Sequence, residues 1–261
     1  MLDEMQSKIK FLNVTKQFNN HSNDGAVLRD ISFNIFAEEF VCVLGSSGSG
    51  KSTILGLIAG FIKPTVGEVL FNSKHVQRPD GSRTLVFQDY ALFPWLNIQD
   101  NIAFGLTTKK HSKKQANKTA LEYLELVGLL DYKDYNVSQI SGGMKQRVAI
   151  ARALAVDPEV LLLDEPFGAL DQQTRESMQT ELLRLFVKTK KTVVFVTHSV
   201  DEALKLADRV LVIGGKPGKL LLDTTLTVSK PRDFQDPRIV SIRDEILDKI
   251  AHTDYFMGAD I

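Results

Sequence analysis

The segment 45–52 constrains the fold of this chain more than any other. Its sequence is Gly-Ser-Ser-Gly-Ser-Gly-Lys-Ser, which matches the pattern G-x-x-x-x-G-K-[ST]. A continuous apolar run at residues 40–44 precedes the segment, and the apolar-rich residues 54–58 follow it. We therefore predict a buried strand, a tight glycine-rich loop and a helix in direct succession, because glycine allows a backbone to curl this sharply.

Such a loop is typical of a phosphate-binding site. Its backbone N–H groups point inward at phosphate oxygens, and the N-terminus of the following helix adds partial positive charge. We expect Lys51 to reach the β- and γ-phosphates of a nucleotide, Ser52 to bind Mg²⁺, and Thr53 to lie near the α-phosphate. The predicted phosphate-binding residues are Gly45, Ser46, Ser47, Gly48, Ser49, Gly50, Lys51, Ser52 and Thr53.

A second apolar run, residues 160–163, ends in the acidic pair Asp164-Glu165. Adjacent side chains on a strand point to opposite sides, so the two carboxylates can have different tasks. Asp164 fits the Mg²⁺ role, through a coordinated water, and Glu165 fits the base that polarises the attacking water. Acidic strand ends are common, and this pair gains meaning only beside the phosphate-binding loop.

The remaining patterns favour an α/β fold. Ile31, Phe33 and Ile35 alternate with polar residues, which indicates a half-buried strand, whereas residues 193–196 form another continuous apolar run. Buried runs that alternate with helical stretches suggest a parallel sheet wrapped by helices. Residues 90–157 have a mostly helical pattern between strand-rich flanks, and a last helix is expected near residues 239–250.

Local signals mark several helix ends. Ser112 with Gln115, and Ser199 with Glu202, fit the capping box that starts a helix. Asp157-Pro158 should end the helix that runs through residues 148–155.

Composition excludes some classes of protein. Lys plus Arg and Asp plus Glu both number 32, so the chain lacks the basic surplus of a nucleic-acid-binding protein. The single cysteine, Cys42, cannot form an internal disulfide, and we expect a small buried apolar group in a reducing cytosol. The acidic N-terminus does not resemble a signal peptide, and no apolar run approaches the length of a membrane span.

Four further motifs carry a family resemblance. Residues 141–147, Ser-Gly-Gly-Met-Lys-Gln-Arg, resemble the ABC signature, and Gln88 resembles the Q-loop glutamine. Residues 168–171, Gly-Ala-Leu-Asp, resemble the D-loop, and Thr197-His198 resembles the H-loop. Together with the phosphate-binding loop and the acidic pair, they follow the order found in ATP-binding subunits of ABC transporters. The resemblance covers essentially the whole chain.

The resemblance implies a fold and a division of the chain. The expected fold is α/β, a P-loop NTPase core with a mainly parallel sheet, an antiparallel β subdomain and an inserted helical subdomain. Residues 1–261 would form a single ABC ATPase domain, with the helical subdomain at approximately 90–157.

The resemblance also implies a mechanism. Two such subunits pair head to tail, and each ATP lies between the phosphate-binding loop of one and the Ser141 loop of the other. A helix start carrying Ser141 and the N–H groups of two glycines is also an anion site on physical grounds. His198 would hold the γ-phosphate, Gln88 would touch Mg²⁺, and Phe18 would stack on adenine unless it is a core residue. Outside the phosphate-binding loop, the implied nucleotide-binding residues are Phe18, Gln88, Ser141, Gly142, Gly143, Asp171 and His198. The implied catalytic residues are Lys51, Gln88, Glu165 and His198. The implied metal-binding residues are Ser52, Gln88 and Asp164.

Residues 88–106, 167–171 and 230–234 look like the ATPases of nitrate, sulfonate and taurine importers. This resemblance implies a homodimer that binds ATP and Mg²⁺ and drives solute uptake by ATP-dependent dimerisation. Its partners would be two transmembrane permease subunits and an extracytoplasmic solute-binding protein, with no nucleic acid. The subunit would be peripheral, on the cytoplasmic side of the bacterial inner membrane. The solute itself leaves no pattern in the chain, because this subunit does not touch it.

The sequence departs from the family pattern at two places, and two alternative functions remain open. Glu38 occupies a turn position where the family usually has glycine, and Met144-Lys145 replaces the commonest end of the signature. The alternative functions are a soluble ABC-type ATPase not coupled to transport and a catalytically inactive regulatory cassette. The apolar residues 93–96, Phe-Pro-Trp-Leu, are either core or a docking site for a cytoplasmic helix of the permease.

Overall fold

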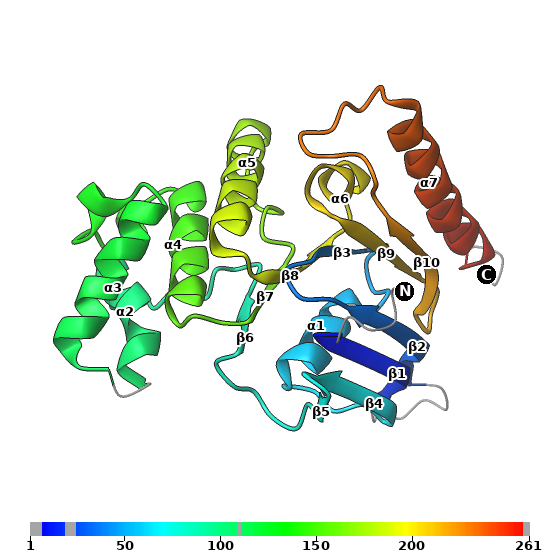
Figure 1. Ribbon diagram of the computed structural model, residues 1–261, viewed down its shortest axis with the longest axis horizontal. Coiled ribbons are helices and arrows are strands. Elements are labelled where there is room, and N and C mark those ends of the chain that lie inside the picture. Colours follow the sequence, from blue (N-terminus) through cyan, green and yellow to red (C-terminus); the bar gives the residue numbers. More distant parts are fainter. Residues whose placement is uncertain (1–6, 19–24, 109–110, 258–261) are drawn as a thin grey trace. The chain divides into compact units, whose positions relative to one another are not determined.

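The computed structural model describes residues 7–18, 25–108 and 111–257 (Figure 1). The chain divides into two compact units. The first consists of residues 1–80 and 192–261, and the second, residues 81–191, interrupts its sequence. The segment predicted to be helical, residues 90–157, falls within the second unit.

An antiparallel sheet with strand order β2-β1-β4-β5 forms one part of the first unit. β1 pairs with both β2 and β4, and the rings of Phe11 and Phe33 stack across it with their centroids 4.4 Å apart. The predicted half-buried strand is confirmed, since Ile31, Phe33 and Ile35 are buried and Ser32 is exposed. The strands are β1 (Ile9–Gln17), β2 (Ala26–Ile35), β4 (Val66–Phe71) and β5 (Lys74–His75).

A mainly parallel sheet, with β10, β9, β3 and β8 as neighbours in that order, forms the second part of this unit. β3 lies between two parallel partners, and its Leu44 stands opposite Thr197 and Val212. Every residue of β3 is buried, as predicted, and burial raises the pKa of the Cys42 thiol well above its ordinary value, so this thiol is a core group. The strands are β3 (Phe40–Leu44), β8 (Thr192–Thr197), β9 (Arg209–Gly214) and β10 (Lys219–Thr225).

Three helices belong to the first unit. α1 ends at Ala59 and is followed by Gly60, whose φ of 84° fits a glycine C-cap. α7 packs on α6, β9 and β10 through buried residues that include Ile239 and Ile246, which confirms the predicted last helix (Figure 1). Along the described stretches of chain, no helix is long and apolar enough to cross a membrane. The helices are α1 (Lys51–Ala59), α6 (Val200–Leu206) and α7 (Pro237–Met257).

The second unit is a helical cluster beside two parallel strands. β6 and β7 pair in register, with Val86 opposite Leu163, and α2, α3 and α4 pack against one another (Figure 1). The strands are β6 (Arg83–Val86) and β7 (Val160–Asp164). The helices are α2 (Ile98–Thr108), α3 (Lys113–Leu126), α4 (Gly142–Ala155) and α5 (Gln172–Thr189), with 3₁₀ turns η1 (Leu130–Tyr132) and η2 (Val137–Gln139).

The helix-end predictions hold with one correction. Ser112 and Gln115 form the full capping box of α3, and α4 ends at Ala155, before Asp157-Pro158. Ser199 accepts a hydrogen bond from the Glu202 N–H, but its own N–H donates to the Thr197 hydroxyl at 3.0 Å. The reciprocal half of the predicted box is therefore wrong, because the buried Glu202 carboxylate bonds the Thr197 hydroxyl at 2.6 Å.

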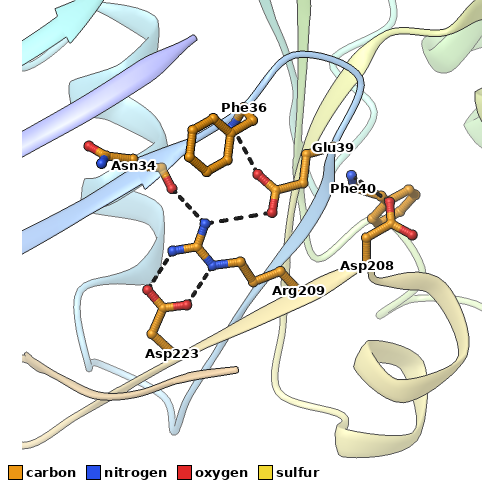
Figure 2. A network of polar contacts seen from close by, with 7 residues as sticks. All are labelled: Asn34, Phe36, Glu39, Phe40, Asp208, Arg209 and Asp223. Carbon is orange, nitrogen blue, oxygen red and sulfur yellow. Dashed lines mark hydrogen bonds and ion pairs between the residues drawn. The ribbon is translucent and has the colours of Figure 1, made fainter. Parts of the chain in front are cut away.

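A polar network joins the two sheets of the first unit (Figure 2). The Arg209 guanidinium of β9 makes two parallel hydrogen bonds to the Asp223 carboxylate of β10, at 2.5 and 2.6 Å, and donates to the Asn34 carbonyl of β2 at 3.0 Å. Its third partner is Glu39, 3.6 Å away. Burial raises the pKa of Glu39, against the opposing effect of its hydrogen bond from the Phe36 N–H.

Candidate nucleotide-binding and hydrolysis site

The glycine-rich segment forms a tight loop between β3 and α1. Gly50, at φ 94°, is the N-cap of α1, and Lys51 is its first residue. The Lys51 ammonium is buried and donates to the carbonyl oxygens of Gly45 and Ser46, both at 2.9 Å. The loop thus curls around its own lysine, the arrangement expected of a phosphate-binding loop.

Two glycines of this loop are required by close packing. A Cβ atom at Gly45 would lie 2.1 Å from the Ile213 carbonyl oxygen, and one at Gly50 would lie 2.5 Å from a methyl carbon of Leu28. Since real Cβ atoms do not approach so closely, β9 and β2 press directly on the loop. The sequence pattern predicted a curled loop, and the structure adds this second reason for its glycines.

His198 lies beside the beginning of this loop. Thr197, the last residue of β8, stands opposite Leu44, the last residue of β3, so His198 and Gly45 follow paired residues on neighbouring strands. The side chain of His198 is exposed. Parallel strands therefore bring the predicted γ-phosphate ligand and the phosphate-binding loop to one edge of the sheet.

Thr197 and Glu202 hold the His198 segment, and sequence patterns alone did not single them out for this role. The Thr197 hydroxyl donates to the Glu202 carboxylate and accepts from the Ser199 N–H, so the residues on both sides of His198 are fixed. Both Thr197 and Glu202 are buried. The sequence feature that could have identified Glu202 is its position: it is a carboxylate on the apolar face of the first turn of a helix, four residues after His198.

Phe18 is not a core residue, because 38% of its surface is exposed. Phe18 follows Gln17, which pairs with Ala26 of β2. Val27, the residue after Ala26, has a methyl carbon that would lie 3.3 Å from a Cβ atom at Gly50. The structure thus places Phe18 near the α1 end of the phosphate-binding loop. Its ring is covered on one face by the Lys16 ammonium, 4.8 Å from the centroid, and its stacking on adenine stays a prediction.

The acidic pair lies in the second unit, at the carboxyl end of β7. Asp164 is the last residue of the strand, and both carboxylates are half-buried. Glu165 has a φ of 42°, in the left-handed region that non-glycine residues seldom adopt, and its carbonyl accepts from the Gly168 N–H. Such backbone strain is concentrated at functional sites, and here it turns the chain sharply at the predicted base.

Gln88 lies beside this acidic turn. It follows β6, whose Val86 pairs with Leu163 of β7, and its side chain is exposed. A Cβ atom at Gly168 would lie 3.3 Å from the Gln88 amide nitrogen and 3.4 Å from the Glu165 carbonyl oxygen. The structure therefore brings together Gln88, Glu165 and Gly168, and the catalytic and metal-binding roles of Gln88 and Glu165 stay predictions.

The signature-like loop opens α4. Ser141 is the exposed N-cap, and its hydroxyl accepts from the Met144 N–H at 3.3 Å. A Cβ atom at Gly143 would lie 2.7 Å from the Thr174 methyl carbon, so glycine lets α4 approach the start of α5. Both helix starts face a pocket of about 430 Å³. The N-terminus of α4 adds partial positive charge at this pocket, which favours an anionic ligand, whereas the start of α5 is already capped by the Asp171 carboxylate.

Asp171 has a structural role that its motif did not reveal. It is the N-cap of α5, where its carboxylate accepts from the Thr174 N–H at 3.0 Å. Hydrogen bonds with Thr174 lower the pKa of Asp171. Its predicted part in nucleotide binding stays a prediction.

Asn101 and Arg152 hold the segment after Gln88 in place. The sequence motifs did not indicate either residue. Asn101 of α2 is fully buried; its amide oxygen accepts from the Phe93 N–H, and its amide nitrogen donates to the carbonyls of Phe93, Leu96 and Asn97. Arg152 of α4 donates to the carbonyls of Tyr90 and Ala91 at 2.9 and 2.8 Å, and burial lowers its pKa. The one signal for Asn101 was a polar residue beside Ile98 and Ile102 on the apolar side of a predicted helix.

The donors predicted for Mg²⁺ suit that ion. Ser52 offers an exposed hydroxyl in the first turn of α1, and Asp164 a half-buried carboxylate. No group of three His, Cys, Asp or Glu residues that could cage a metal occurs among the described residues. Mg²⁺ usually keeps several waters and binds through one or two protein oxygens plus substrate phosphates, and hydroxyl, amide and carboxylate oxygens suit it. That Ser52, Gln88 and Asp164 bind it stays a prediction.

Comparison with known proteins agrees with the motifs. The family model for the ABC transporter matches residues 28–168. A taurine import ATP-binding protein of Roseobacter denitrificans is 48% identical, over 74% of this chain and 72% of that protein. A bicarbonate transport ATP-binding protein of Synechocystis is 42% identical, over 93% and 90% of the two chains, and a nitrate import ATP-binding protein of Synechococcus elongatus is 42% identical, over 92% of each.

Solved structures give the same fold. A dimeric ATP-binding cassette in a post-hydrolysis state, bound to ADP and Pi, has a TM-score of 0.74 at 34% identity and covers 85% of this chain and 100% of that one. The cbiO1 protein of Clostridium perfringens, part of the cbiONQ transporter complex, has a TM-score of 0.77 at 28% identity and covers 95% and 98%. The predicted fold class is confirmed, and the chain belongs to the ABC transporter family as an ATP-binding, ATP-hydrolysing subunit.

Proposed function

We propose that this chain is the energising subunit of an importer for a small polar solute of the taurine, nitrate or bicarbonate kind. The proposal rests above all on the chain's 42–48% identity to import and transport subunits named for these three solutes. The complete set of hydrolytic residues, each on the loop where the family motif requires it, supports an active rather than a regulatory cassette.

The residues divide the hydrolytic work as follows. Lys51 and the loop N–H groups bind the β- and γ-phosphates, and Phe18 stacks on adenine. Glu165 accepts a proton from water as the water oxygen attacks the γ-phosphorus, and the bond to the β-γ bridging oxygen breaks to give ADP and phosphate. Ser52, Gln88 and Asp164 would hold Mg²⁺, which would neutralise charge on the phosphate oxygens when bound, and His198 positions the γ-phosphate.

A second copy of the chain completes each site. Ser141 and Gly142 are exposed and Gly143 is buried at a helix start that suits an anion, in a unit whose acidic pair we assign to a nucleotide. The relative bound to ADP and Pi is a dimer. We infer that the Ser141 loop of one subunit contacts the ATP bound at Lys51 of its partner, and that this contact drives ATP-dependent dimerisation.

Two permease subunits attach to this dimer on the cytoplasmic side of the inner membrane, and an extracytoplasmic solute-binding protein serves them. The residues 93–96 support this attachment, since Trp95 is 74% exposed rather than core. Phe93 lies 5.3 Å from Trp95 and 4.5 Å from the half-exposed Phe104, between ring centroids. Exposed aromatic clusters of this kind are typical anchors for a docked helix.

Glu165→Gln tests the hydrolytic assignment, because the amide keeps the shape of glutamate and removes the base. We expect the ATPase rate of the assembled transporter to fall by about 10²-fold or more, with ATP binding retained and ATP-bound dimers accumulating. Full turnover by this variant would refute the role of Glu165.

Ser141→Arg tests the composite site. The isolated variant should bind ATP as the wild type does, yet fail to hydrolyse it or to dimerise with ATP. Mixing it with Lys51→Ala subunits should restore at most one composite site per dimer. If Ser141→Arg lowers the ATP affinity of the monomer instead, Ser141 belongs to its own subunit's pocket, and the proposed arrangement is wrong.

A further inference from the structure

The turn between β9 and β10 is pressed against the phosphate-binding loop. A Cβ atom at Gly45 would lie 2.1 Å from the carbonyl oxygen of Ile213, near the end of β9, and Gly218 approaches the loop at Ser49. A Cβ atom at Gly218 would lie 2.1 Å from the Ser49 carbonyl oxygen. At positions 45 and 218, therefore, only glycine fits between the turn and the loop.

Main-chain hydrogen bonds fix this turn in place. The Gly218 N–H donates to the Val27 carbonyl at 2.8 Å, and the Arg29 N–H donates to the Gly218 carbonyl at 2.9 Å. Gly218 thereby forms a parallel bridge with Leu28, whose side chain contacts Gly50 of the loop. The turn is held by β2 on one side and by β9 on the other, so it presents its side chains at a defined position.

Lys216 is the charged residue at the tip of this turn. A Cβ atom at Gly48 would lie 3.5 Å from its Cε atom and 3.9 Å from its ammonium nitrogen, so the end of the lysine side chain lies against the loop. Lys216 is exposed, and within the part of the chain that the structure describes its ammonium has neither a hydrogen bond nor an ion pair. Among the described residues, therefore, this positive charge beside the phosphate-binding loop is not paired with another group.

We propose that Lys216 is a second phosphate-binding cation, which attracts and contacts the phosphate tail of a nucleoside di- or triphosphate from the outer rim of the loop. Lys51 binds from inside the loop, where its ammonium already bonds two carbonyl oxygens. The free ammonium of Lys216, on a four-carbon stem, can follow the phosphates as they enter. The inference deepens the proposed function, because it assumes that a nucleotide binds this loop.

The test is calorimetric binding of MgATP, and separately of inorganic tripolyphosphate, to the full-length subunit. Lys216→Ala should weaken both ligands by about fivefold at low ionic strength, the upper range for one partly exposed charge pair. The loss should shrink in 0.5 M salt, which screens exposed charges to within roughly 4–5 Å. Lys216→Arg should stay within about twofold of the wild type. Lys219→Ala is the matched control, since Lys219 is an exposed lysine of the same hairpin and should also stay within about twofold.

Three outcomes would overturn the proposal. If Lys216→Ala binds both ligands as tightly as the wild type does, Lys216 does not contact the phosphates. An equal loss in Lys219→Ala would show an effect of net charge alone. Unchanged monomer affinity with loss of ATP-induced dimers would assign Lys216 to the subunit interface. The proposed function fails separately, if the wild-type chain does not bind MgATP or if Lys51→Ala binds it equally well; thermal melts confirm that each variant is folded.

Discussion

Replacement of Asn101 by aspartate tests whether the segment after Gln88 depends on one buried amide. The amide nitrogen donates to the carbonyl oxygens of Phe93, Leu96 and Asn97 at 3.1, 3.2 and 3.0 Å. Aspartate has the same shape but puts an acceptor oxygen against these three acceptors. An unsatisfied buried polar group costs about 1–3 kcal/mol, and the aspartate would still accept the hydrogen bond from the Phe93 N–H. We therefore expect the free energy of unfolding to fall by roughly 3 kcal/mol.

The measurement is thermal and urea unfolding of the isolated subunit at several pH values. A loss of roughly 3 kcal/mol should lower the melting temperature by about 6–12 °C for a chain of this size. The buried aspartate should have a raised pKa, because protonation restores a donor. Its penalty is therefore greatest at neutral pH and shrinks as the pH falls toward the unfolded pKa.

Trp95→Ala is the matched control for this variant. Its side chain belongs to the same segment but is 74% exposed, so its removal should shift the melting temperature by no more than about 2 °C. It should instead weaken assembly with the permease, measured by pull-down. Wild-type stability of Asn101→Asp, or a large stability loss in Trp95→Ala, would refute this account of the segment.

Two further predictions concern the first unit. Glu38→Gly should stabilise the subunit by about 0.5–1 kcal/mol in urea unfolding, because Glu38 has a φ of 60° that suits glycine; a lower stability would contradict this. Burial raises the pKa of Glu39, so its contribution to stability falls as the pH rises above the ordinary value of 4.5. The stability of Glu39→Gln relative to the wild type should therefore increase from pH 4 to pH 7, and pH-independent relative stability would refute the raised pKa.

The parts of the fold that the sequence predicted are those set by short-range patterns. Continuous apolar runs gave the buried strands β3, β7 and β8, because a strand covered on both faces admits almost no polar residue. The Ser112 box gave the start of α3, since both of its hydrogen bonds lie within four residues. The glycine pattern gave the phosphate-binding loop together with the strand before it and the helix after it.

The parts that escaped prediction depend on contacts that the sequence motifs do not include. Arg152 bonds the carbonyls of Tyr90 and Ala91, about 60 positions earlier in the chain, and main-chain acceptors leave no sequence signal. The Ser199 box was only half right because a third residue, Thr197, offered the Glu202 carboxylate a stronger partner. The capping-box rule considers only Ser199 and Glu202, so it does not anticipate a competitor that lies two residues before the N-cap.

These long-range contacts join three features of the second unit. Gln88 lies against the Glu165–Gly168 turn, and the residues two and three positions after it are bonded to Arg152 of α4. The same helix begins at Ser141, so the acidic turn, the segment that leads to Trp95 and the anion-binding helix start form one connected structure. If Gln88 shifts when a γ-phosphate is bound or lost, as the proposed function implies, the carbonyls held by Arg152 are the contacts through which α4 would respond. We propose that these contacts link the occupancy of the nucleotide site to the exposed aromatic cluster, a link that a subunit coupled to a permease requires.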